Sequence, residues 1–214
     1  MAENKKIKYI YVVFSATPYK MGKFIRVLVR SEYNHISLSM SPDIKTLYSY
    51  SRHYLNTALY GGFNEESLMR YQCRKKDSKI MVCALPVSED QYDHLQGKLE
   101  SIKADREDYI YNFISAVTSP FGKPVRLKNS YTCIEFVCML LSYIGVYRGK
   151  DPSPSFDRLR ALLEKYKIFE GRSMEYSLSD GWGNDGFPNR RSFAFYVSAV
   201  NKNAKKLIKK YRER

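Results

Sequence analysis

The chain has 214 residues and a formal net charge of +14 at pH 7, and 44% of its residues are hydrophobic. This composition excludes a disordered or collagen-like chain and is sufficient for one sizeable core. We expect a single domain over residues 1–214, with its core at about 7–145 and a C-terminal elaboration with a basic tail at 146–214. No apolar run is long enough to cross a bilayer and no signal peptide is evident, so a cytoplasmic location is expected.

Strand patterns dominate the first third of the chain. Residues 7–15 are rich in β-branched and aromatic side chains, which predicts a buried strand, and a Thr-Pro pair then predicts a helix over 19–30. Residues 34–40 and 46–51 are two further predicted strands, and the Ser-Pro-Asp between them is typical of a hairpin turn. The pair Gly61-Gly62 indicates a loop.

Helical patterns dominate the remainder. Residues 79–87 are a third predicted core strand, and Ser88 with Gln91 resembles a capping box that opens a helix to about residue 104. The hairpin implies antiparallel pairing, so the order of elements predicts an α+β domain with helices packed against a small antiparallel sheet. Further helices are expected at 108–117, 132–145 and 156–166, and residues 191–200 are either a late strand or part of a terminal helix.

Cys133 stands at the start of the clearest predicted helix, at the N-terminal end of its apolar stripe. Unpaired backbone N–H groups and the positive end of the helix dipole favour a thiolate at such a position, and the same N–H groups stabilise an oxyanion. Cys133 is therefore our candidate nucleophile, and a buried structural thiol is the alternative interpretation. The stripe consists of Val137, Leu140, Leu141 and Ile144.

The other three cysteines have different surroundings. Cys83 and Cys138 lie within apolar runs and are typical of buried structural thiols, whereas Cys73 has basic neighbours and is expected to be exposed. No cysteine pair has zinc-binding spacing. A zinc site built from His35, Cys133 and a further thiol is therefore only a remote alternative, and no cofactor or metal is expected.

A nucleophilic cysteine needs a base, and the sequence contains three histidines, His35, His53 and His94. His35 lies on the polar face of the predicted strand 34–40, while His94 lies in a helix of charged residues. An imidazole held on a sheet opposite a thiolate on a helix has the geometry that nucleophilic catalysis requires, so His35 is the candidate base. A hydrogen-bonded structural histidine is the alternative.

Three segments, taken together, carry a resemblance to a known family. The segment Asn34-His35-Ile36-Ser37-Leu38-Ser39 precedes Leu47-Tyr48-Ser49-Tyr50-Ser51, and Tyr131-Thr132-Cys133-Ile134-Glu135-Phe136-Val137 follows later. With the histidine strand before the cysteine helix, the chain resembles the circularly permuted NlpC-type, papain-like cysteine hydrolases, which include the YiiX-like proteins and the lecithin retinol acyltransferase group. The resemblance covers about residues 7–145. It implies a permuted papain-like fold with the nucleophile at a helix N-terminus.

The resemblance also implies roles for individual residues. Cys133 would be the nucleophile, His35 the general base, and Ser49 the third polar residue that orients the imidazole. Serine is a weaker orienting residue than the His, Glu or Asp that the family often has there. Glu135 matches an acidic residue that often follows the cysteine, although a charge that favours the helix dipole explains it equally well. Tyr131 is the second supporting residue.

Two functions from different classes follow. The first is a cysteine-dependent hydrolase or acyltransferase, of the peptidase, amidase or thioesterase type, that acts on an amide or ester bond through an acyl-enzyme. Its substrate would be a peptide, a cell-wall peptide or a lipid. The second is a non-catalytic binding module on the same fold that engages nucleic acid or an anionic membrane surface through its basic charge. No motif for specific nucleic-acid recognition is present.

Two C-terminal segments leave their roles open. Residues 202–214 contain seven basic residues and one acid, which predicts a short basic helix that either contacts an anionic surface or is simply solvated. Residues 181–188 are rich in Gly, Asn, Asp and Pro and are expected to form an irregular loop, either a plain surface loop or a border of the cleft.

Overall fold

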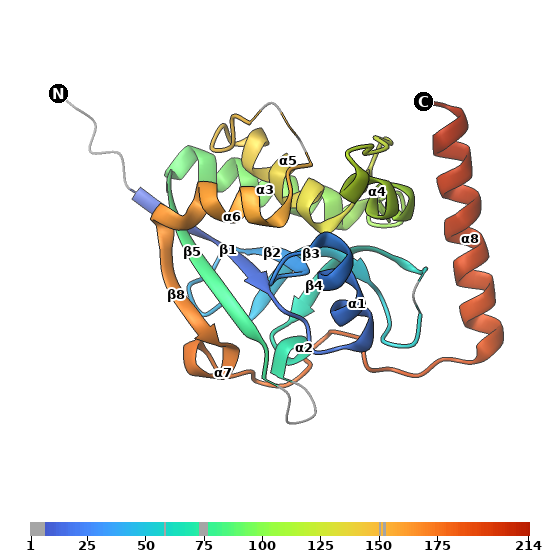
Figure 1. Ribbon diagram of the computed structural model, residues 1–214, viewed down its shortest axis with the longest axis horizontal. Helices are drawn as coiled ribbons and strands as arrows, with labels where there is room; N and C mark the ends of the chain where they lie inside the picture. The colour runs from blue at the N-terminus through green and yellow to red at the C-terminus, as the bar shows by residue number, and fades with distance from the viewer. Residues whose placement is uncertain (1–6, 58, 73–76, 150, 152) are drawn as a thin grey trace.

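The computed structural model describes residues 7–57, 59–72, 77–149, 151 and 153–214. The strands of this part of the chain are β1 (Ile7–Ser15), β2 (His35–Ser39), β3 (Thr46–Arg52), β4 (Gly61–Ser67), β5 (Lys79–Ser88), β6 (Ile110–Tyr111), β7 (Ser130–Tyr131) and β8 (Lys167–Arg172). They form one curled sheet in the order β7-β6-β4-β3-β2-β1-β5-β8, in which only β6 and β7 are parallel (Figure 1). The chain is therefore α+β, as expected, but its sheet has eight strands rather than a few.

The prediction of a loop at Gly61-Gly62 is wrong, because β4 begins at Gly61. A Cβ atom at Gly61 would lie 2.5 Å from the carbonyl oxygen of Ser51, and one at Gly62 would lie 2.3 Å from that of Tyr109. Neighbouring backbone therefore occupies the space that any side chain would need. The glycines here permit close strand packing and do not end a strand.

The four predicted strands at 7–15, 34–40, 46–51 and 79–87 are present, and most of the predicted helices are present as well. The capping box of Ser88 and Gln91 opens the helix at 89–104, and residues 193–200 of the segment 191–200 begin a long terminal helix. The predicted helix at 108–117 is only partly correct, since its first residues form β6. The helices are α1 (Lys20–Val29), α2 (Met69–Gln72), α3 (Glu89–Ala104), α4 (Phe113–Thr118), α5 (Cys133–Tyr143), α6 (Phe156–Leu163), α7 (Ser173–Tyr176) and α8 (Phe193–Arg212).

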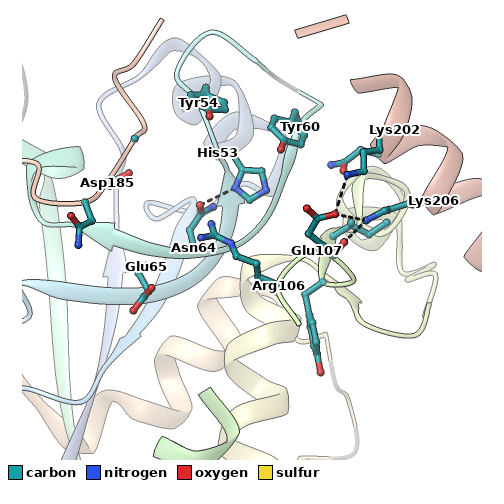
Figure 2. A pocket seen from close by; sticks show the side chains of 15 residues that line it. His53, Tyr54, Tyr60, Asn64, Glu65, Arg106, Glu107, Asp185, Lys202 and Lys206 are labelled. Carbon is teal, nitrogen blue, oxygen red and sulfur yellow. Dashed lines mark hydrogen bonds and ion pairs between the residues drawn. The ribbon is translucent and has the colours of Figure 1, made fainter. Parts of the chain in front are cut away.

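The terminal helix α8 stands along one edge of the molecule (Figure 1). Lys202 and Lys206 on its inner face pair with Glu107, with Nζ–Oε2 distances of 2.9 and 3.8 Å (Figure 2). Asn203 Nδ2 donates a hydrogen bond of 3.0 Å to the Gly61 carbonyl at the start of β4. These contacts fix one face of α8 to the body of the protein.

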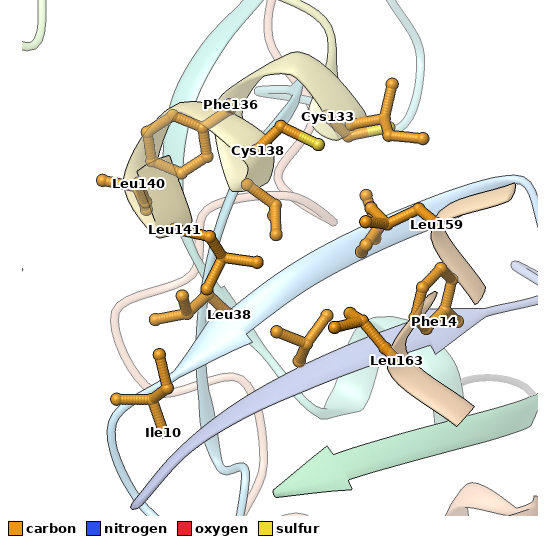
Figure 3. Packing of buried hydrophobic residues seen from close by; sticks show 14 of the residues in the cluster. Ile10, Phe14, Leu38, Cys133, Phe136, Cys138, Leu140, Leu141, Leu159 and Leu163 are labelled. Atoms are coloured by element: carbon orange, nitrogen blue, oxygen red, sulfur yellow. The ribbon is translucent and has the colours of Figure 1, made fainter. Parts of the chain in front are cut away.

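Apolar clusters cover both faces of the sheet. The larger cluster joins the strands to α3, α5 and α6, and Figure 3 shows Leu38 of β2 beneath Leu141 of α5. A smaller cluster on the opposite face includes Leu47, Leu68 and Tyr71. Because both faces are covered, β2 is buried along its whole length, including the face predicted to be polar.

The C-terminal segment continues the same sheet. Strand β8 pairs with β5, so part of the expected elaboration at 146–214 lies at the edge of the central structure. Within the described ranges, no helix combines the length and the apolar character needed to span a membrane.

Candidate active site

Cys133 is the first residue of α5, and the start of this helix is closed by a capping box. The Thr132 hydroxyl accepts a hydrogen bond of 3.3 Å from the Glu135 backbone N–H, and Glu135 Oε2 accepts one of 2.7 Å from the Thr132 N–H. The other Glu135 oxygen accepts a hydrogen bond from Ser115 of α4. Glu135 therefore caps α5 and joins it to α4, and this arrangement holds Cys133 in place.

The structure brings Cys133 and His35 together in one pocket. Cys133 is 6% exposed and His35, the first residue of β2, is 8% exposed. Both line a cavity of about 280 Å³, and they lie close enough for Cys133 to raise the pKa of His35. Because Nε2 of His35 is bonded elsewhere, Nδ1 is the ring nitrogen that remains for the thiol.

Behind His35 lies a carboxylate that the sequence patterns did not single out, Glu66 of β4. His35 Nε2 is 3.1 Å from Glu66 Oε2, and Glu66 is 2% exposed. The same oxygen accepts a hydrogen bond of 2.5 Å from the Tyr71 hydroxyl. Glu66 Oε1 accepts hydrogen bonds from Ser49 Oγ at 2.6 Å and from Arg70 Nη1 at 3.2 Å.

Ser49 forms a hydrogen bond with a different partner from the one that the resemblance implies. Its hydroxyl donates to the Glu66 carboxylate, and that carboxylate in turn contacts His35. Glu66 therefore occupies the orienting position beside the imidazole, and Ser49 positions Glu66. The sequence offered little indication of Glu66, because the glycine pair that precedes it suggested a loop.

Burial and neighbouring charges shift the pKa values of His35 and Glu66 in opposite directions. Burial lowers the pKa of His35, but the Glu66 carboxylate and the hydrogen bond to Cys133 outweigh it and raise the pKa to about 10. Burial raises the pKa of Glu66, but the positive charges of His35 and Arg70 outweigh it and bring that pKa far below its usual 4.5. At neutral pH the two residues therefore form a buried imidazolium–carboxylate pair.

Arg70 connects this pair to a distant segment. It is 4% exposed, and its Nε and Nη2 donate hydrogen bonds of 2.6 Å to the two carboxylate oxygens of Asp185. Phe187, two residues further along, lines the cavity with its ring centroid 4.3 Å from Arg70 Cζ. Of the two interpretations of residues 181–188, the structure therefore supports the one in which they border the cleft.

Mostly apolar and aromatic side chains line the rest of the cavity. Tyr111 of β6 lies close enough to Cys133 to interact with it electrostatically. Burial raises the pKa of Tyr111 well above 10, and negative charge at Cys133 and Glu135 adds to the effect, so its hydroxyl stays protonated. The apolar and aromatic part of the lining includes Ile25, Tyr50, Leu59, Phe113, Val117 and Phe187.

Tyr131, the second supporting residue expected from the resemblance, has a packing contact. Its ring meets the ring of Tyr50 edge to face, with 5.5 Å between the centroids. Tyr50 lines the cavity that contains Cys133, so Tyr131 supports one wall of that cavity.

The other histidines lie elsewhere. His53 Nδ1 is 3.0 Å from Asn64 Oδ1, and burial lowers the His53 pKa to about 4 although this hydrogen bond opposes the shift. His53 lines a separate cavity of about 420 Å³ between β4 and α8 (Figure 2). His94 is exposed on α3.

Neither Cys83 nor Cys138 lines the cavity that contains Cys133. Cys83 and Cys138 are buried in the apolar core, as predicted, and burial raises the pKa of each to about 12. The prediction for Cys73 concerns a residue outside those that the structure describes. Among the described residues, no three His, Cys, Asp or Glu side chains are grouped so that they could hold a metal ion.

The arrangement is chemically capable of nucleophilic catalysis. A thiol at a helix start faces a buried imidazole, and a carboxylate with four partners holds the far side of the ring. Comparisons of the chain with protein-family models, with curated proteins and with solved structures found no match.

Proposed function

We propose that the protein is a cysteine-dependent hydrolase or acyltransferase that acts on an amide or ester bond through an acyl-enzyme at Cys133. The observation that carries the proposal is the position of His35, between the Cys133 thiol and the buried Glu66 carboxylate. A carboxylate that stabilises an imidazolium beside a thiol favours the thiolate–imidazolium pair, which is the reactive form of a cysteine nucleophile. The order of His35 and Cys133 in the chain supports a permuted papain-like arrangement.

The chemistry follows from these positions. The Cys133 thiolate attacks the carbonyl carbon, and the carbonyl π electrons move to oxygen to form a tetrahedral oxyanion. Backbone N–H groups at the start of α5 and the protonated Tyr111 hydroxyl are the donors that stabilise this oxyanion. The bond to the leaving nitrogen or oxygen then breaks, and His35 gives that atom its proton.

During release of the acyl group, His35 acts as a base instead of an acid. Water or another acceptor attacks the thioester carbonyl, neutral His35 takes the acceptor's proton, and the thiolate leaves. The apolar wall of the cavity, with Val117 and Phe113, favours a substrate whose acyl part is apolar.

Thiol labelling tests the nucleophile. We expect iodoacetamide at pH 6 to add one carbamidomethyl group to Cys133 far faster than to Cys138, because only Cys133 has an imidazolium partner. The change His35→Ala removes that partner and should slow the labelling of Cys133, while His94→Ala, on the exposed surface of α3, should leave the Cys133 rate unchanged. Equal labelling of Cys133 and Cys138 in the unmodified protein would rule out the nucleophile assignment.

A second experiment tests turnover. Activated esters and anilides with short or long acyl chains would be incubated with the protein, and the acyl-enzyme would be located by peptide mass spectrometry. We expect an acyl group on Cys133, release of product, and loss of both in Cys133→Ser but not in Cys138→Ser. An added amine or alcohol that captures the acyl group would distinguish transfer from hydrolysis. Labelling without any acylation across the panel would favour the non-catalytic module.

A further inference from the structure

Helix α8 has an outer face that carries an apolar stripe in contact with solvent. Phe193 is 82% exposed, Val197 43%, and Ile208 and Tyr211 are each 50% exposed. Their spacing places them on one side of the helix, and the exposed Ala204 lies between them on the same side. The buried residues of α8, Ala199, Asn203 and Leu207, form the adjoining side of the helix, which packs against the body.

Cationic side chains accompany this stripe. Lys205, Lys209 and Arg212 are exposed, and among the contacts of the described residues the only ion pair of these three joins Lys209 to Glu213, 3.8 Å away at the end of the same helix. The lysines on the inner face differ, because Lys202, Lys206 and Lys210 pair with Glu107 or Asp108 of the body. The outer face is thus both apolar and positively charged.

We propose that the outer face of α8 docks onto the surface of an anionic lipid bilayer, with the helix lying in the plane of the interface. Helix α8 has 20 residues, or about 30 Å of helix, and combines Phe193 and Val197 with a row of lysines, which is the composition of an interfacial amphipathic helix. Anionic headgroups complement the lysines, and the acyl boundary accepts the apolar side chains.

The same observations weigh against two other occupants. A second copy of α8 against this face would bring Lys205, Lys209 and Arg212 of both copies together, and like charges repel. A nucleic acid would satisfy the charges but would leave Phe193 and Ile208 without apolar partners. A bilayer satisfies both features. This inference concerns a surface outside the Cys133 cavity and does not depend on the proposed chemistry.

Vesicle sedimentation with the full chain tests the proposal. We expect binding to vesicles of phosphatidylcholine with 30% phosphatidylglycerol, no binding to pure phosphatidylcholine, and weaker binding as salt is raised. The double change Lys205→Ser with Lys209→Ser should lower the affinity about thirtyfold. Phe193→Ser with Val197→Ser should lower it at least tenfold, because less apolar area enters the interface.

Matched control variants carry the same kinds of substitution at exposed positions far from α8. Leu162→Ser with Ile168→Ser removes two side chains that are 49% and 55% exposed, and Arg148→Ser with Lys165→Ser removes two exposed cations. We expect both controls to bind like the unmodified chain, and circular dichroism would show that every variant is folded.

Three results would overturn the proposal. The first is the absence of binding to anionic vesicles, or binding that the α8 variants retain. The second is a concentration-dependent dimer that Phe193→Ser abolishes, which would assign the face to a second copy. The third is equally tight binding to a DNA duplex that survives loss of the apolar stripe, which would assign the face to nucleic acid.

Discussion

Replacement of Glu66 by glutamine removes the negative charge beside His35 and so measures the effect of that charge on the imidazole. Glutamine has nearly the same shape, and its carbonyl oxygen still accepts one of the hydrogen bonds from Ser49, Arg70 or Tyr71. The His35 pKa of about 10, against an ordinary value of 6.5, corresponds to roughly 5 kcal/mol in favour of the imidazolium. Because the Glu66 charge is the largest of the effects that raise this pKa, we expect the His35 pKa to fall in the variant.

The assay is the rate of iodoacetamide labelling at Cys133 across pH 5 to pH 9. If about half of the roughly 5 kcal/mol comes from the Glu66 charge, the population of the thiolate–imidazolium pair falls about 100-fold in Glu66→Gln. We therefore expect labelling at pH 6 to slow by about that factor.

Glu65→Gln is the matched control. Glu65 is the preceding residue of β4, and its carboxylate pairs with Lys103 on the protein surface at 2.9 Å. We expect this variant to label like the unmodified protein. If a folded Glu66→Gln protein also labelled at the unmodified rate, the idea that Glu66 sustains the reactive pair would be refuted.

Three further predictions concern the same network. Ser49→Ala removes a hydrogen bond to a buried carboxylate and should lower the free energy of unfolding by about 2 kcal/mol in urea titrations. Asp185→Asn leaves Arg70 with less compensating charge and should lower the thermal midpoint by roughly 10 °C; an unchanged midpoint would show that the contact is dispensable. Stability should also depend on pH. The lowered Glu66 pKa gives a contribution that is present above pH 4.5 and lost as pH falls, whereas the raised His35 pKa gives one that is present below pH 6.5 and lost as pH rises through about 10. Unfolding titrations should show both losses, and Glu66→Gln should flatten them.

Local patterns were sufficient to identify the elements that carry Cys133 and His35. A helix start is encoded by a few consecutive residues, and Thr132 with Glu135 forms a capping box within four positions. Strand β2 is likewise evident from the alternation that follows His35. The sequence by itself therefore determined the candidate nucleophile, the candidate base and their order in the chain.

The position of Glu66 in the site was determined by tertiary structure. Pairing of β3 with β4 places Ser49 opposite Asn64, two residues before Glu66, so Ser49 and Glu66 share one face of the sheet. No local pattern reveals this register. The glycines that begin β4 are required because the backbones of Ser51 and Tyr109 pack against them, and these two residues are distant in sequence or belong to another strand. A glycine required for close packing and a glycine in a turn look the same in a sequence.

The contribution of the C-terminal segment was also a matter of tertiary structure. Asp185 reaches Arg70 across 115 positions of sequence, and a carboxylate within a Gly-rich loop gives no indication of such a partner. The basic composition of the terminal helix could be read directly from the chain. Which of its lysines face Glu107 and which face solvent was settled only when one side of α8 packed against the body. Composition is a local property, whereas partners depend on how distant segments meet.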